Sequence, residues 1–245
     1  MTPRITLVTA RRVLEQLRGD RRTVALLIVV PCVLIVLMKY VLEGDPETFQ
    51  RIGVPMLGIF PLISMFLVTS IAMLRERTTG TLERLMTMPL AKIDLLGGYA
   101  LAFALMAAIQ VACVSVVAFL FLDLNVAGST WLVFLLAVAN ALLGMALGLF
   151  LSAFASTEFQ AVQFLPAFLL PQLLLCGLIV PRDVMAQPLQ YLADVLPMTY
   201  AYDALNGVAT EATVSSDTVV DALVVVGCMV LALCLGAATL RRRTA

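Results

Sequence analysis

Side chains that could bind a partner gather in one short internal stretch, residues 75–90. The sequence there is RERTTGTLERLMTMPL, with five charged residues and four threonines in 16 positions. The stretch lies between two of the most apolar segments of a chain that is 62% hydrophobic. Carboxylates and guanidiniums at this density can form ion pairs, so the surrounding elements must decide what they contact.

The residue types on which most catalysis depends are absent or misplaced. The chain has no histidine, which excludes His-based triads, imidazole proton relays and His metal sites. All five cysteines fall inside apolar runs without C-x-x-C spacing, so we interpret them as small buried hydrophobes. The sequence also lacks a G-x-x-x-x-G-K-[ST] motif. We therefore expect no catalytic residue, metal or cofactor in this chain, and another polypeptide must supply energy for any work.

The composition predicts an all-α membrane protein. Mean hydropathy is +1.03 and 13% of residues are charged, whereas soluble chains carry roughly 25% charged residues. The apolar runs are about 20 residues long, as membrane-spanning helices require. Six spans are predicted, at about 23–42, 54–74, 95–122, 131–155, 159–180 and 219–240.

The distribution of charge predicts the orientation. If residues 1–22 are cytoplasmic, 13 of the 16 basic residues lie inside and 10 of the 16 acidic residues lie outside. By the positive-inside rule both ends of the chain, and the stretch 75–90, are expected to be cytoplasmic.

Two segments outside the spans have helical patterns. Residues 1–22 carry a basic stripe beside an apolar face of Leu7, Ala10, Leu14 and Leu17, which predicts an interfacial amphipathic helix or a simple topology signal. Residues 181–218 predict two short helices dipping into the outer leaflet, broken at Pro197 and stopped at 206–207, or else a plain surface loop.

Polar residues within the spans are few and uncharged. Gln110, Asn140, Gln163 and Gln172 are expected to form hydrogen bonds between helices. Small residues every four positions, at Gly144, Gly148 and Ser152, predict a close-packed helix face. The stripe Gln160, Phe164, Phe168 and Gln172 could contact an amphipathic substrate or serve packing alone, as could Phe60 and Phe66.

The stretch 75–90 itself predicts a short helix. Gly80 can act as its N-cap, Glu83 completes a box-like start, and Pro89 ends it. Leu82, Leu85 and Met86 fall on one face. A helix of about two turns is marginal in water, so it must pack on the membrane, on the spans or on a partner.

These motifs resemble those of ABC-2 type transporter permeases. The pattern Glu76-Arg77-x-x-Gly80-Thr81-Leu82-Glu83-x-Leu85-x-x-x-Pro89-Leu90 is similar to the family signature. Residues 196–205, LPMTYAYDAL, resemble the motif before its last span, and residues 176–181, CGLIVP, resemble the exit from its fifth span. The resemblance covers essentially the whole chain and is greatest to permeases of the drug-resistance, daunorubicin-exporter group.

The resemblance implies a permease subunit of an ATP-driven exporter of drugs or lipid-like molecules. Residues 81–88 would form a coupling helix seated in a separate cytosolic ATPase, which binds ATP and Mg²⁺. Two permease copies and two ATPase copies would assemble in the plasma (inner) membrane of a prokaryote, without nucleic acid. The implied ATPase-coupling residues are Glu76, Arg77, Gly80, Thr81, Leu82, Glu83, Arg84, Leu85 and Met86. The implied path residues are Phe60, Phe66, Phe164, Phe168 and Gln172, and the outer-gate residues are Pro181, Pro197, Tyr200 and Asp203.

Two other classes of function stay open from the residues alone. One is a facilitator or channel that needs no partner. The other is a non-transporting membrane scaffold whose stretch 75–90 recruits a cytosolic protein.

Overall fold

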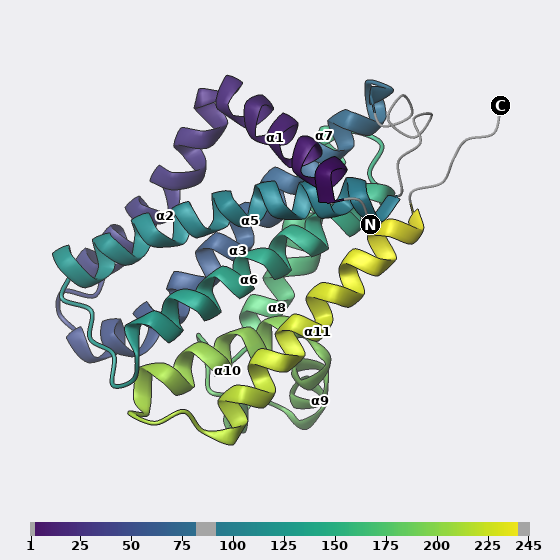
Figure 1. The fold of residues 1–245 in the computed structure, drawn as a ribbon. Coiled ribbons are helices and arrows are strands. Elements are labelled where there is room, and N and C mark those ends of the chain that lie inside the picture. The colour runs from purple at the N-terminus through teal and green to yellow at the C-terminus, as the bar shows by residue number, and fades with distance from the viewer. Residues whose placement is uncertain (1–2, 82–91, 240–245) are drawn as a thin grey trace.

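The computed structural model describes residues 3–81 and 92–239, and this part of the chain is built from helices (Figure 1). It contains six helical segments long and apolar enough to cross a membrane, which confirms the predicted fold class. The membrane-length helices are α2 (Arg21–Val41), α3 (Pro46–Thr78), α5 (Lys92–Val116), α6 (Thr130–Leu151), the broken helix α7 (Glu158–Phe164) and α8 (Leu170–Leu175), and α11 (Ser216–Thr239). The shorter ones are α1 (Pro3–Gly19), α9 (Gln187–Val195) and α10 (Pro197–Thr210).

Helices α3 and α6 form the centre of the bundle, and their contact is the most extensive between any two elements. Gly144 lies against the Leu62 backbone and Gly148 against the Phe66 backbone, so close that an added Cβ at either glycine would overlap a carbonyl oxygen. Ser152 is fully buried one turn further on. The predicted small-residue face is therefore confirmed as the surface that lets two helices approach closely.

Hydrogen bonds between helices involve three of the four amides predicted to form them. Gln110 Nε2 donates to Ser64 Oγ at 2.5 Å, and Asn140 Nδ2 donates to the Ala201 carbonyl at 3.0 Å. Gln172 Oε1 accepts from the Met198 amide at 3.4 Å. Gln163 is exposed, so its predicted role is not seen.

The second span is longer than predicted. Helix α3 has 33 residues, or about 50 Å at 1.5 Å per residue, against a hydrocarbon core of about 30 Å. It begins early because Asp45 caps it, accepting from the Thr48 amide at 3.1 Å, and because Pro46 suits a first-turn position. Its far end therefore projects beyond the hydrocarbon, or the helix tilts strongly.

The fifth span is shorter than predicted and irregular. Its helix ends at Leu175 rather than at 180, and Gly177 then takes φ +99°, a conformation that glycine adopts readily. Between α7 and α8, residues Leu165–Leu169 form a π-helical turn. Pro166 within this turn lacks an N–H, which removes a helical hydrogen bond and accounts for the interruption.

Two short helices, α9 and α10, follow the fifth span, as predicted for this segment. The expected stop at 206–207 is wrong, because α10 continues to Thr210. Gly207 fits inside the helix because its missing Cβ leaves room for the Thr218 hydroxyl of α11. Pro197 begins α10 as well as separating it from α9.

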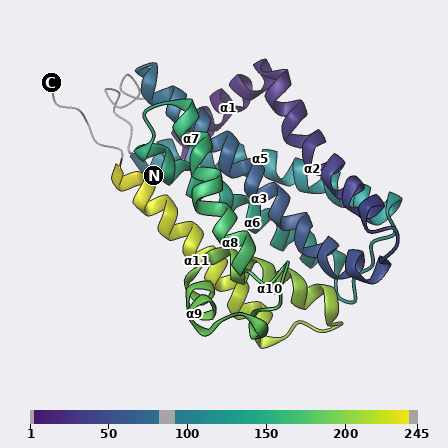
Figure 2. The same cartoon turned by 180° about the vertical axis from the view of Figure 1, so that it is seen from behind.

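The elements define two ends of the bundle. Helix α1 lies at one end, near the end of α11, while α9 and α10 lie at the opposite end (Figures 1 and 2). Helix α1 packs along α5, with Thr9 against Gly98. Helix α2 lies at the edge of the bundle in both views and is mostly exposed.

Candidate functional site

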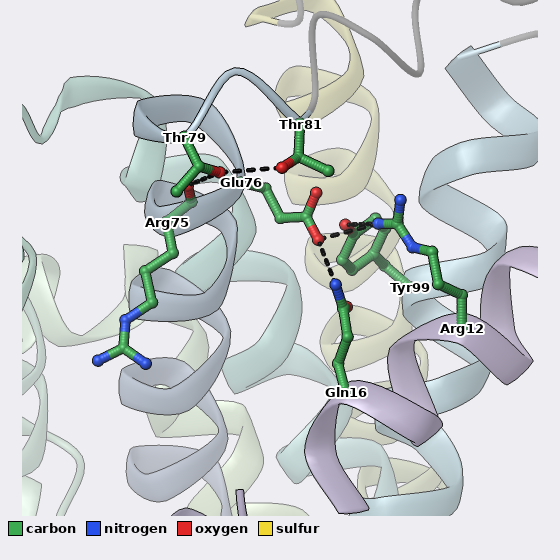
Figure 3. Close-up of polar contacts among 7 residues, drawn as sticks. All are labelled: Arg12, Gln16, Arg75, Glu76, Thr79, Thr81 and Tyr99. Atoms are coloured by element: carbon green, nitrogen blue, oxygen red, sulfur yellow. Dashed lines mark hydrogen bonds and ion pairs between the residues drawn. The ribbon is translucent and has the colours of Figure 1, made fainter. Parts of the chain in front are cut away.

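A buried polar cluster joins α1, α3 and α5 where α3 ends (Figure 3). Arg12 Nη2 donates to Glu76 Oε1 at 2.9 Å and to Tyr99 Oη at 2.7 Å. Gln16 Nε2 donates to the same Glu76 oxygen at 3.2 Å. Glu76 is only 7% exposed, and its ion pair with Arg12 offsets the cost of burying a carboxylate.

Helix α1 brings two donors to one carboxylate because Arg12 and Gln16 are four residues apart and share a helix face. The neighbouring Ala10 and Val13 are buried against the core, with Leu14 and Leu17 packed beside them. Leu7, placed on this face by the sequence pattern, is 60% exposed instead. The apolar contacts therefore set the rotation of α1 that points Arg12 at Glu76.

The residues after Glu76 turn the chain out of α3. The Thr79 amide and the Thr79 hydroxyl both donate to the Arg75 carbonyl, at 2.9 Å and 2.8 Å. Gly80 takes φ +71°, the left-handed conformation typical of the residue that ends a helix. Thr81 Oγ1 lies 3.0 Å from Thr79 Oγ1. This turn sets the direction in which the chain enters residues 82–91.

A second ion pair fixes the same end of α3 to α7. Arg75 Nε and Nη2 donate to the two oxygens of Glu158, at 2.7 Å and 3.2 Å. Both side chains are about half exposed, so the pair adds little to stability and mainly fixes how the end of α3 lies against α7.

The structure describes four of the nine predicted coupling residues. Glu76 and the half-buried Arg77, Gly80 and Thr81 lie at the end of α3 and in the turn after it. Arg77 Nε and Nη2 are buried without a partner among the described residues. The predictions for Leu82, Glu83, Arg84, Leu85 and Met86 lie outside the described residues, as does the predicted N-cap role of Gly80 for the helix they would form.

The sequence patterns did not identify Arg12, Gln16 or Tyr99 as partners of Glu76. The spacing of Arg12 and Gln16 beside Val13 was visible as a helix face, but nothing local shows which carboxylate that face meets. The contact spans 64 positions between Arg12 and Glu76 and 87 between Arg12 and Tyr99.

A cavity of about 610 Å³ lies beside this cluster, between α1, α2, α3 and α5. Its apolar wall includes Leu27, Val30, Val68 and Phe103, and Glu76 lies on its wall. Most polar residues of the lining lie around the end of α3 and the start of α2. They are Gln16, Asp20, Thr23, Arg75, Glu76, Thr79, Thr81 and Tyr99, and the remaining one, Ser64, lies about three turns earlier on α3.

At the opposite end, Arg182 connects α9 to α10. Its Nη2 donates to Asp203 Oδ2 at 2.6 Å, and its Nη1 lies 3.6 Å from Asp194 Oδ1. Burial raises the pKa of Asp203 to about 6, although the Arg182 charge acts in the opposite direction. Tyr200 Oη donates to the Asp194 carbonyl at 2.6 Å. Of the predicted outer-gate residues, Tyr200 and Asp203 therefore share this network, Pro197 begins α10, and Pro181 lies exposed before Arg182.

The predicted path residues do not form one surface within a single chain. Phe66 is 0% exposed and Gln172 is 1% exposed, so both lie in the interior. Phe164 and Phe168 are half-buried on the broken fifth span, and Phe60 is half-buried on α3. In this conformation only Phe60, Phe164 and Phe168 retain accessible surface for a substrate.

Among residues 3–81 and 92–239, no group of three or more His, Cys, Asp or Glu side chains is placed to hold a metal ion. The polar cluster of α1, α3 and α5 consists of one ion pair and hydrogen bonds, which suit it to holding helices together and to binding a charged group.

Comparison with known proteins identifies the family. Residues 3–209 match the family described as ABC-2 type transporter. The chain belongs to the ABC-2 type transporter family. Family membership is what the motifs around Gly80 and Pro197 predicted, and it agrees with the six helices long and apolar enough to cross a membrane.

Two curated relatives have informative names. The chain is 26% identical over 141 residues to "ABC transporter G family member 20" of Dictyostelium discoideum, a match that covers 58% of this chain and 19% of that protein. It is 29% identical over 148 residues to "Probable multidrug ABC transporter permease YbhR" of Escherichia coli, covering 60% of this chain and 40% of that protein. The matched region is thus less than half of either relative.

Proposed function

We propose that this ABC-2 chain is the permease subunit of an exporter that moves an amphipathic drug or lipid-like molecule across a prokaryotic plasma membrane. A separate cytosolic ATPase binds ATP and Mg²⁺ and supplies the energy. Two permease copies and two ATPase copies form the complex. The family match and the relative named as a multidrug permease support this assignment.

The proposed orientation places the α1 end in the cytoplasm. Of the basic residues in the described part of the chain, 9 of 12 belong to segments at this end, and 10 of the 15 described acidic residues belong to segments at the α9–α10 end. An excess of Lys and Arg on the cytoplasmic side is the general rule for membrane proteins.

The observation that carries the proposal is the cluster Arg12–Gln16–Glu76–Tyr99. It joins three helices directly before residues 81–88, the proposed coupling helix. Separating a buried ion pair leaves an uncompensated charge, which is strongly disfavoured. A push by the ATPase on residues 81–88 would therefore move α1, α3 and α5 together.

The proposed coupling residues divide into two roles. Glu76 acts from inside the chain, because its carboxylate is buried and bonded to Arg12 and Gln16. Arg77 is the candidate for direct contact, because its side chain is only half-buried and its Nε and Nη2 lack a partner among the described residues. An ATPase carboxylate would pair with this guanidinium. Glu83 and Arg84 would add charge pairing, while Leu82, Leu85 and Met86 would enter the groove.

The substrate path is proposed to lie between the two copies, along α3 and the broken fifth span. Phe60, Phe164 and Phe168 are its candidate contacts. The network of Tyr200 and Asp203, with Pro181 and Pro197 at the helix ends, would form the outer gate.

The test is purification of the chain in mild detergent from its native membrane, followed by assay of ATPase activity in what co-purifies. We expect a stoichiometric ATPase subunit that is lost when Leu82 and Glu83 are replaced together by alanine. The control is Glu43→Ala, an exposed residue between α2 and α3 at the other end.

Three outcomes would contradict the proposal. A single-chain preparation that transports without ATP after reconstitution would indicate a facilitator. A bound ATPase whose hydrolysis never responds to substrate would indicate a scaffold. Retention of the ATPase by the double variant would remove residues 81–88 from the contact.

A further inference from the structure

The cavity between α1, α2, α3 and α5 has the polarity of an amphiphile site. Its volume of about 610 Å³ lies within the range of small-molecule pockets, about 300–1,000 Å³. Leu27, Val30 and Val68 contribute to a long apolar wall, and the polar groups are concentrated near Glu76. This cavity is separate from the aromatic stripe of the fifth span, because no residue of α7 or α8 lines it.

One residue that lines the cavity, Glu76, has a buried oxygen without a hydrogen-bond partner among the described residues. Both donors to Glu76, Arg12 and Gln16, bind its Oε1, whereas its Oε2 is buried without a hydrogen-bond partner among the described residues. Figure 3 shows this second oxygen pointing away from Gln16. Since an unsatisfied buried carboxylate oxygen is costly, a ligand that donates an N–H to it would bind favourably.

The charges around the cavity favour a cation. Asp20, Arg75 and Glu76 line it, and the partners of Arg75 and Glu76 are Glu158 and Arg12. These five groups comprise three carboxylates and two guanidiniums. Hydrogen bonds from Thr23 lower the pKa of Asp20, so this carboxylate stays ionised.

Two residues that line the cavity are also exposed on the outside of the bundle. Leu26 and Val30 of α2 line the cavity and are 62% and 44% exposed. Since α2 lies at the edge of the bundle (Figure 1), these residues place the cavity next to the surface that faces lipid, and we expect a ligand to enter from that side.

We propose that this cavity binds a single-tailed amphiphile with a primary ammonium head, which donates to Glu76 Oε2 while the tail lies along the apolar wall. The assignment concerns this chain alone and holds whether or not the transport assignment does. The ammonium could belong to a free alkylamine-type compound or to the head of a membrane lipid.

The experiment uses the full chain in phosphatidylcholine nanodiscs and three photoreactive probes. Each probe has the same dodecyl tail with a diazirine near its end, and the heads are primary ammonium, trimethylammonium and sulfate. We expect the ammonium probe to label residues 23–30 and 64–72 about tenfold more than either other probe, because only it offers a cationic N–H donor. Labelled peptides are identified by mass spectrometry.

Two variants test the site. Glu76→Gln should reduce labelling by the ammonium probe about tenfold and leave the sulfate probe unchanged or increased. Because Glu76 also binds Arg12, Ala72→Phe provides a second test. Ala72 lines the cavity from α3 and forms none of the cluster's hydrogen bonds, so a bulky side chain there should abolish labelling. Its matched control is Ala25→Phe, an exposed alanine of α2 that does not line the cavity.

Competition by unlabelled compounds then shows whether the natural ligand is a free amine or a membrane lipid. Displacement by unlabelled dodecylammonium alone supports a free compound, whereas displacement by phosphatidylethanolamine supports a lipid head with the same chemistry. Equal labelling by all three heads, labelling unchanged by Ala72→Phe, or cross-links between two copies at these residues would each overturn the proposal.

Discussion

Arg12 Nη2 lies 2.9 Å from Glu76 Oε1 although the two residues are 64 positions apart, and Tyr99 Oη lies 2.7 Å from the same guanidinium nitrogen. One arginine thus joins the N-terminal helix to the ends of two membrane helices. The junction lies directly before the segment that we propose to contact the ATPase, so its integrity can be tested separately from ATPase binding.

Replacing Arg12 by alanine should destabilise the chain strongly. It leaves the buried Glu76 without its cation, which typically costs about 3–5 kcal/mol. The thermal midpoint in detergent, followed by intrinsic fluorescence, should fall by several degrees, and adding Glu76→Gln should restore part of the loss. Arg11→Ala is the control, because its partner Glu15 is 62% exposed and such pairs contribute about 0–1 kcal/mol. Equal effects of Arg11→Ala and Arg12→Ala would show that the cluster is not a junction.

A side chain at Gly80 should disturb the turn through its backbone conformation rather than through a steric clash. An added Cβ would meet no described residue within 4 Å, but φ is +71°, so Gly80→Ala should cost about 1 kcal/mol and redirect the turn. Gly80→Asn should be tolerated better, because asparagine visits this conformation more readily. The measurement is ATPase stimulation in the purified complex, with Gly19→Ala as the control, since Gly19 has equal space without the positive φ. Normal stimulation in Gly80→Ala would exclude the turn from coupling.

Gly144 should tolerate no side chain. A Cβ there would overlap the Leu62 carbonyl on α3, so Gly144→Ala must separate the two central helices, at a cost of roughly 1–3 kcal/mol. Gly227→Ala in α11 is the matched change, because a Cβ added there would have no neighbour within 4 Å in the part of the chain that the structure describes. The measurement is the thermal midpoint, which should be lower for Gly144→Ala than for Gly227→Ala. Equal midpoints would mean that α3 and α6 are not packed this closely.

The Asp203 network predicts a pH dependence. Burial, together with the negative charges of Asp221 and Asp194, raises the pKa of Asp203 to about 6 despite the opposing effect of Arg182. The folded chain therefore holds this proton more tightly than the unfolded chain, where the pKa of aspartate is about 4. The resulting stabilisation is complete below pH about 4 and is lost as pH rises through about 6.

Asp203→Asn should remove this component, so the thermal midpoint should fall less between pH 4 and about 7 in the variant than in the parent chain. Asp183→Asn is the control, because Asp183 is exposed on the same segment. Identical pH profiles for the parent chain and Asp203→Asn would show that Asp203 does not titrate in this range.

Local sequence rules predicted most of the helices but misplaced several ends. The cap at Asp45 extends α3, and the left-handed Gly177 shortens the fifth span. Hydropathy averaged over a window does not detect these effects, because each depends on one or two residues. Helix α10 passes through 206–207 because Thr218 of α11 packs against Gly207, and this contact overrides a local stop signal.

Composition and period by themselves determined that this chain is an all-α membrane protein, because lipid leaves the backbone no alternative to internal hydrogen bonding. The sequence also predicted the small-residue face of α6, since residues four positions apart lie on one side of a helix. The partner of Glu76 was decided only by the tertiary structure. A carboxylate at the end of an apolar helix could face water, lipid headgroups or another subunit, and only the packing of α1 against α5 turns Arg12 and Gln16 toward it.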